Sequence, residues 1–175
     1  RLRKSSPLPT PENPYSMDVM TRPEPLLPQI ERDFPAFVFA PGEVFAWLPE
    51  KQTITHPTVT TDDDIAQLLH ELSHGILQHT TYDRDIQLID MEREAWKYAV
   101  KTLAPRYAFS LAMDDDFVQA ALDSYRDWLH ERSTCPKCNA VGLEVAKHRY
   151  RCLHCQGEWR VNEAKQCQLR RYRVV

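Results

Sequence analysis

The spacing of apolar and polar residues predicts three amphipathic helices in the middle of this chain. Apolar residues recur at intervals of three and four over about 62–79, 86–103 and 114–131. Aspartates occupy 62–64 and 114–116, where carboxylates cap a helix and suit its positive N-terminal end. Pro105 is expected to end the second helix, because proline lacks the amide hydrogen that a helix uses.

Shorter elements are predicted on either side of these helices. Strand-forming residues in 35–49 surround the turn dipeptide Pro41-Gly42, which predicts a β-hairpin, and 53–61 is expected to be a loop or a short strand. Residues 1–30 hold seven of the 13 prolines and are expected to form an extended arm or linker. The predicted fold class is therefore α+β, with a small sheet or hairpin and about three helices over 31–131 and a small module over 132–175.

The first predicted helix carries the motif H-E-x-x-H at His70, Glu71 and His74. A spacing of four residues places both imidazoles on one helix face, where they can hold one Zn²⁺. Glu71 lies next to the first of them, within reach of a water molecule at such a metal. The capped, amphipathic helix around the motif favours a hydrolytic metal site over two histidines that only pack or pair.

A catalytic zinc needs a third protein ligand, and the second predicted helix offers one. Glu92 lies within the apolar stripe of that helix, where a carboxylate is costly unless it is paired or bound to metal. Glu94 points almost to the opposite side and is the second choice. His79 is a third candidate, but five residues after His74 it turns away from the ligand face. The metzincin motif is excluded, because Thr80 stands where its third histidine would be.

The stretches "LLHELSHGILQH" and "MEREAWKYAV" resemble the zincin-like metallopeptidases of the ImmA/IrrE and ArdC type, and the resemblance covers about residues 36–104. It implies a minimal zincin-like metallopeptidase core that hydrolyses peptide bonds in a protein substrate. The implied roles are zinc ligation by His70, His74 and Glu92, with Glu71 as general base.

The resemblance does not assign the residue that orients a ligand histidine, the strand that pairs with substrate, or the donor that stabilises the oxyanion. Gluzincins such as thermolysin often place an aspartate, which orients a ligand histidine, where this chain has Trp96; Asp90 or Glu94 could replace it. The segment "EVFAW", residues 43–47, could pair with an extended substrate strand. The candidates for stabilising the oxyanion are His56, His79, Tyr82 and Tyr98.

Four of the five cysteines form two C-x-x-C pairs, Cys135 with Cys138 and Cys152 with Cys155. Paired thiolates at this spacing favour a structural zinc in a closed tetrahedral cage over redox dithiols or iron. The segments "HRYRC" and "GEWRV" are expected to be short strands, so the module is predicted to be a zinc ribbon. Cys167 is left over and is expected to be an ordinary buried thiol.

The net charge of −3 conceals a basic C-terminal module. Residues 132–175 contain ten Lys or Arg and three Asp or Glu, while the rest of the chain is acidic. Basic and aromatic residues that alternate in sequence suit phosphate contact and base stacking, although a solvated basic surface is the alternative. The predicted nucleic-acid-binding residues are Lys147, Arg149, Arg151, Arg160, Arg170, Arg171 and Arg173, with Tyr150, Trp159 and Tyr172 among them.

The order of an H-E-x-x-H domain and a zinc ribbon is similar to SprT-type proteases, which act on DNA-associated proteins. That family takes its third ligand from a later histidine, so the similarity concerns the architecture only. We therefore predict a zinc metallopeptidase that its ribbon directs to nucleic acid or to a nucleic-acid-bound protein. The alternative is a non-catalytic regulator or DNA-binding adaptor, for which Glu71 would have no chemical use.

No apolar stretch approaches the roughly 18–20 residues of a membrane span, and the basic N-terminal segment lacks the apolar core of a secretory signal. A cytoplasmic protein, or one bound in the nucleoid or nucleus, with no membrane partner, is expected.

Overall fold

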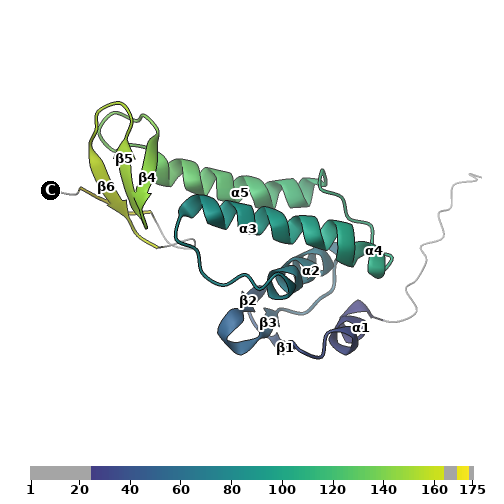
Figure 1. The fold of residues 1–175 in the computed structure, drawn as a ribbon. Coiled ribbons are helices and arrows are strands. Elements are labelled where there is room, and N and C mark those ends of the chain that lie inside the picture. The colour runs from purple at the N-terminus through teal and green to yellow at the C-terminus, as the bar shows by residue number, and fades with distance from the viewer. Residues whose placement is uncertain (1–24, 164–168, 174–175) are drawn as a thin grey trace, which may run out of the picture.

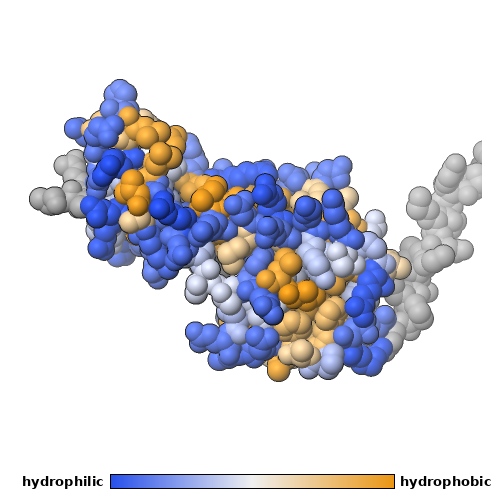
Figure 2. All heavy atoms as spheres, in the orientation of Figure 1, coloured by the Kyte–Doolittle hydropathy of each residue, from blue (hydrophilic) through white to orange (hydrophobic). Residues whose placement is uncertain are grey.

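The computed structural model describes residues 25–163 and 169–173, and within them the fold is mixed α+β, as predicted. Figure 1 shows the long helices α3 and α5 side by side, with α2 and a small sheet below them. A second sheet lies beyond the C-terminal end of α5. The chain therefore has one layered body and one appended sheet, and Figure 2 shows a mainly hydrophilic surface with hydrophobic patches on both parts.

Helix α1 (Leu26–Asp33) contradicts the expectation that the proline-rich segment stays extended up to residue 30. Pro25 is the N-cap and Pro28 lies in the first turn, where the amide hydrogen that proline lacks has no helical partner anyway. Leu26 and Ile30, one turn apart, are buried in the core and hold α1 on the body. The predicted arm over 1–24 lies outside the described residues.

The predicted hairpin over 35–49 is wrong, because β1 (Val38–Pro41) and β2 (Ala46–Leu48) do not pair with each other. Strand β3 (Thr53–His56) lies between them, parallel to β1 and antiparallel to β2. The tight connection is the 3₁₀ turn η1 (Pro49–Lys51), which joins β2 to β3. Among the described residues, one edge of β2 pairs with β3 and no strand pairs with its other edge, the free edge of β2.

Contacts of β3 with the preceding loop explain this arrangement. The amide of Gly42 donates to the carbonyl of His56 over 2.9 Å. The hydroxyl of Thr55 donates to the carbonyl of Val44, and a Cβ on Gly42 would lie 3.0 Å from the Cβ of Thr55. The loop after Pro41 therefore wraps around β3 instead of turning directly back on β1.

Helix α2 (Asp62–Ile76) begins with the predicted cap. The hydroxyl of Thr61 accepts from the amide of Asp64, and the Asp64 carboxylate accepts from the amide of Thr61. Leu68, Leu69 and Leu72 are completely buried and anchor the helix in the core. The helix ends three residues earlier than predicted.

Helix α3 (Asp85–Tyr98) continues as the π-helical turn η2 (Ala99–Leu103) and the short helix α4 (Ala104–Arg106). Pro105 therefore does not end the predicted helix over 86–103. It lies in the first turn of α4, directly after the wider π turn, where no tight α-helical carbonyl meets its ring.

Helix α5 (Asp116–Ser133) agrees with the third predicted helix, and the side chain of Asp115 caps it. The appended sheet follows with strands β4 (Gly142–Ala146), β5 (Arg149–Cys152), β6 (Glu158–Val161) and β7 (Arg171–Arg173), in that spatial order. The predicted strands "HRYRC" and "GEWRV" correspond to β5 and β6. In the described part of the chain, no helix has the length and apolar character needed to cross a membrane.

Candidate metal centre

Three side chains from two helices converge on one point inside the body. His70 and His74 lie one turn apart on α2, and Glu92 comes from α3 beside it. The Nε2 atom of His70 is 3.1 Å from Nε2 of His74 and 3.1 Å from Oε2 of Glu92, and the third side of this triangle is 3.5 Å. All three residues are buried.

The triangle has the dimensions that a metal ion requires. Ligand bonds of 2.0–2.1 Å to a tetrahedral zinc place the ligand atoms about 3.3 Å apart. Each of the three residues offers one ligand atom, and these atoms all lie within 4.8 Å of one another. His70, His74 and Glu92 could therefore hold a metal ion. Glu94, the second choice as a ligand, is exposed and does not reach this point.

The electrostatic environment keeps Glu92 ionised. Burial alone would raise the pKa of Glu92, but hydrogen bonds and the charges of His70 and His74 hold that pKa well below its usual range. Burial raises the pKa of Tyr125, and a hydrogen bond to Glu92 raises it further, so the phenol stays protonated and donates to the carboxylate. Tyr125 lies within the third predicted helix, and its hydroxyl is a functional group that the sequence pattern did not reveal.

Glu71 points from α2 toward the edge strand β2. Its Oε2 atom accepts from the amide of Trp47 over 2.8 Å, and Oε1 accepts from the side chain of Gln67 over 3.0 Å. Gly75 makes this approach possible, because a Cβ there would lie 2.9 Å from the ring of Phe37 and 3.3 Å from the ring of Trp47. The free edge of β2 therefore lies directly beside the carboxylate.

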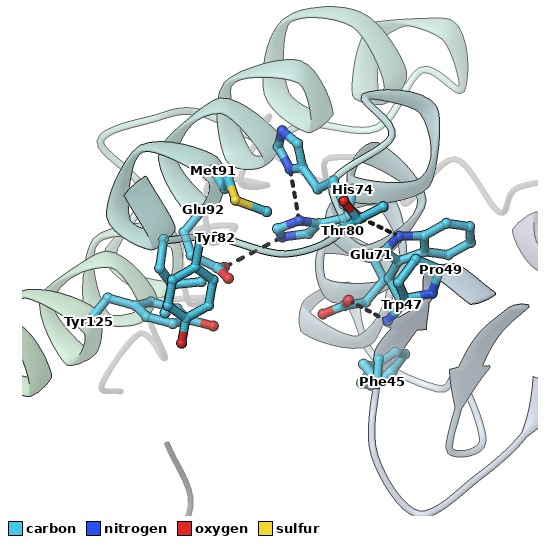
Figure 3. Close-up of a pocket in the computed structure, with 13 residues that line it drawn as sticks. Phe45, Trp47, Pro49, Glu71, His74, Thr80, Tyr82, Met91, Glu92 and Tyr125 are labelled. Carbon is cyan, nitrogen blue, oxygen red and sulfur yellow. Dashed lines mark hydrogen bonds and ion pairs between the residues drawn. The ribbon is translucent and has the colours of Figure 1, made fainter. Parts of the chain in front are cut away.

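A cavity of about 300 Å³ is lined by Glu71, His74 and Glu92. Figure 3 shows Phe45 and Trp47 on the side of β2, Tyr82 and Tyr125 on the opposite side, and His74 and Glu92 between them. Leu88 and Met91 of α3 also line the cavity. The cavity thus has apolar and aromatic walls around a small set of convergent polar groups, as ligand sites usually do.

Of the histidines and tyrosines predicted to stabilise the oxyanion, some line the cavity and others lie away from it. Tyr82 lines the cavity, and Tyr125 joins it there. His79 also borders the cavity, but its ring contacts His74 at a distance of 2.9 Å between the two Nδ1 atoms. His56 lies elsewhere, against the carbonyl of Pro57, and Tyr98 does not line the cavity.

Trp96 stacks flat on the ring of His70, with 4.2 Å between the ring centroids. Asp90 pairs with Arg93 at the surface and takes no part in the site. Glu94 lies 3.7 Å from Nε2 of His79, and the ring of His79 in turn contacts His74.

The four cysteines of the C-x-x-C pairs converge in the appended sheet. The Sγ atoms of Cys135 and Cys155 are 3.7 Å apart and those of Cys138 and Cys152 are 3.5 Å apart, and all four are free thiols. Zinc–sulfur bonds of about 2.3 Å place tetrahedral sulfur ligands about 3.8 Å apart. This group could also hold a metal ion.

Backbone geometry at the two cysteine pairs fits thiolate ligands. Asn139 and Gln156, each directly after the second cysteine of a pair, have φ angles of 59° and 60° and turn the chain back. The amides of Cys155 and His154 donate to the sulfur of Cys152 and lower the pKa of its thiol to about 6. Cys167 lies outside the described residues.

The outer face of the appended sheet carries part of the predicted basic surface. Arg149, Arg160 and Tyr172 lie opposite one another on β5, β6 and β7 and are exposed, so they form one row across the sheet. Arg149 and Arg151 both donate to Glu158, which neutralises part of their charge.

The remaining basic residues have different settings. Lys147 lies 5.9 Å from the centre of the Tyr82 ring, next to the cavity. Arg171 donates to the backbone carbonyl of Glu131, and Arg170 is exposed. The side chain of Arg173 is outside the described part of the chain.

The expectation that Tyr150 and Trp159 stack on bases is wrong. Both are 1% exposed and stack on each other in the core of the sheet, with ring centroids 5.6 Å apart. Alternation along β5 and β6 places them on the face opposite to Arg149 and Arg160. Of the three aromatic residues, only Tyr172 is available at the surface.

A buried ion pair joins α3 to α5, and residues of the appended sheet bind to it. Asp85 at the start of α3 and Arg132 near the end of α5 are both completely buried, with Nε of Arg132 2.5 Å from a carboxylate oxygen. The hydroxyl of Tyr150 donates to Asp85, and Arg132 donates to Nδ1 of His148. Asp85, Glu144 and His148 also form a compact group, but these contacts already occupy the Asp85 carboxylate.

No family model, no curated protein and no solved structure matches this chain.

Proposed function

We propose that this protein is a metal-dependent peptidase, with zinc held by His70, His74 and Glu92. The observation that carries the proposal is the convergence of these three ligand candidates beside Glu71, at a cavity bordered by a free strand edge. Two histidines and a carboxylate leave a coordination position open, which is typical of hydrolytic zinc sites. A zinc ion there would polarise a substrate carbonyl and make an attacking water more acidic.

Glu71 is the general base in this proposal. Its carboxylate takes a proton from the attacking water and passes it to the leaving amine nitrogen. The amide of Trp47 and the side chain of Gln67 hold the two oxygens of Glu71 in place. The hydroxyl of Tyr82 on the opposite wall is the donor best located to stabilise the oxyanion, because the hydroxyl of Tyr125 already donates to Glu92.

The free edge of β2 favours a peptide substrate over a small amide. Trp47 of β2 lies opposite Ile54 of β3. Its amide points away from β3 and donates to Glu71. An extended peptide on this edge would pair through the carbonyl of Trp47, because the amide already donates to Glu71, and it would run past the carboxylate and the triangle of ligand candidates.

The experiment compares the wild type with Glu71→Gln on an unfolded, fluorescently labelled protein substrate. Glu71→Gln keeps the size of the side chain and the three ligand candidates, so it should retain the metal. Cleavage should fall by a factor of about 10²–10⁴, the usual contribution of general acid–base catalysis. Glu31→Gln, on the exposed surface of α1, is the matched control. Equal cleavage by wild type and Glu71→Gln would contradict the proposal.

We further propose that the four cysteines hold a structural zinc and that the outer face of this ribbon binds nucleic acid. The row Arg149, Arg160 and Tyr172 supports this, because guanidinium groups contact phosphates and an exposed ring can stack on a base. Lys147 beside Tyr82 adds a positive charge at the rim of the cavity. A target bound on the ribbon would therefore lie close to the peptidase site.

A titration with labelled single-stranded DNA at increasing salt tests this second part. Arg160→Gln should weaken binding and reduce the slope of log affinity against log salt, because it removes one phosphate contact. Arg126→Gln, on the exposed side of α5, should change neither. The absence of affinity at low salt would contradict nucleic-acid binding without affecting the peptidase proposal.

A further inference from the structure

The chain turns sharply after α2 and brings His79 back against His74. Gln78 has a φ angle of 56°, in the left-handed region. The amide of His79 donates to the carbonyl of His74 over 2.9 Å, and the amide of Gln78 donates to that of Gly75 over 3.1 Å. These two bonds define a Schellman motif, which ends the helix and reverses the chain.

The reversal places two imidazoles in direct contact. Nδ1 of His79 is 2.9 Å from Nδ1 of His74, while Nε2 of His74 belongs to the triangle with His70 and Glu92. A ligand histidine uses the lone pair of one ring nitrogen and carries its proton on the other. If Nε2 of His74 binds metal, its Nδ1 carries the proton and donates, so Nδ1 of His79 must accept.

His79 is itself held from two directions. The indole nitrogen of Trp47 donates to the backbone carbonyl of His79 over 2.9 Å. If Nδ1 of His79 accepts, its proton is on Nε2, which lies 3.7 Å from the carboxylate of Glu94. The proton on Nε2 of His79 then faces the Glu94 carboxylate, a contact that is electrostatic and too long for a hydrogen bond.

We propose that His79 is a positioning residue that fixes the orientation and the tautomer of His74 for metal binding. Glu94 contributes through its contact with Nε2 of His79. The inference rests on the proposed metal site, and it gives His79 and Glu94 a role other than that of ligand. Groups that orient ligand histidines usually contribute a factor of 10–100 in metal affinity.

The other ligand candidate is held in a different way. Among the described residues, Nδ1 of His70 has no hydrogen-bond partner, and the ring stacks on Trp96 instead. Packing therefore orients His70, whereas a hydrogen bond orients His74. Removal of the acceptor at position 79 should affect His74 alone.

Cobalt binding to the full chain with zinc already in the ribbon tests the inference. The probe is Co²⁺ alone, followed through its visible absorption and through competition with a chromophoric chelator. His79→Leu removes the acceptor, and His79→Asn keeps an oxygen near the position of Nδ1. His130→Leu, on the exposed surface of α5, is the control for the loss of a histidine.

The affinity of His79→Leu for cobalt should be about 10–100-fold lower than that of the wild type, with a changed absorption spectrum. His79→Asn should recover most of the affinity, and His130→Leu should match the wild type. Glu94→Gln should cause a smaller loss, because its contact with His79 is long.

Unchanged affinity and spectrum in His79→Leu would overturn the inference while leaving the metal site intact. Equal losses in His79→Leu and His79→Asn would also overturn it, because they would indicate lost packing and not a lost acceptor. A wild-type protein that takes up no cobalt beyond the ribbon would overturn the proposed function, and this inference with it.

Discussion

Replacement of Asp85 by asparagine should destabilise the protein by about 3 kcal/mol. Loss of one partner from a buried ion pair usually costs 3–5 kcal/mol, because the other charge stays buried. Here the carboxylate of Asp85 meets two nitrogens of Arg132, at 2.5 and 3.2 Å, and the hydroxyl of Tyr150. Asparagine keeps the shape of the side chain but removes its charge.

The remaining contacts of Arg132 place the cost at the lower end of that range. Its guanidinium also donates to the carbonyl of Asn162 and to His148, and it packs on the ring of Trp128 at 4.4 Å. These contacts partly compensate the charge after the substitution. A loss of about 3 kcal/mol is still a large part of the 5–15 kcal/mol that stabilises a typical domain.

Urea unfolding followed by tryptophan fluorescence measures the difference. Asp90→Asn is the matched control, because its pair with Arg93 is exposed and should contribute less than about 1 kcal/mol. The double variant Asp85→Asn with Arg132→Met should be more stable than the sum of the single losses predicts, because neither charge is then left alone. Equal losses in Asp85→Asn and Asp90→Asn would refute the reasoning that the buried ion pair stabilises the protein much more than the exposed one.

Three further predictions concern the helix cap, a close contact and the ribbon. Backbone amides of Thr60 and Thr61 lower the pKa of Asp64 to about 2, below the value of about 3.9 in an unfolded chain. Its contribution to stability is therefore present above pH 4 and lost as the pH falls through 2, so the stability difference from Asp64→Asn should shrink over that interval in acid unfolding curves. Gly75→Ala should gain about 1 kcal/mol in helix propensity but lose about 1–3 kcal/mol through the clash with Phe37, and urea unfolding should show no net stabilisation. Cys138→Ser should abolish amide-exchange protection in β4–β7 while α2 stays protected; protection retained in β4–β7 would contradict a zinc-dependent ribbon.

The convergent side chains of the candidate site were predictable from short-range patterns. The spacing of His70 and His74 fixes their common face on any helix, whatever the remainder of the fold. Glu92 stood out because a carboxylate in an apolar stripe needs a compensating partner, and the structure places it against the two imidazoles. These deductions needed only helical periodicity and the cost of burying a charge.

The arrangement of the small sheet and the position of His79 depended on contacts that no local pattern contains. The loop around β3 is held by Gly42 and Thr55, 13 residues apart in the chain. The turn that returns His79 requires a left-handed conformation at Gln78, where the usual glycine is absent. The burial of Tyr150 was different, because its alternation with Arg149 and Arg151 already placed it on the other face of a strand.

Metal content per chain tests the central claim most directly. The protein is expressed with zinc, and the purified wild type, His74→Asn and Cys138→Ser are compared by mass spectrometry of the metal against protein concentration. The account predicts two zinc ions per chain in the wild type and one in each variant. A single zinc ion in the wild type that persists in His74→Asn and disappears in Cys138→Ser would contradict it.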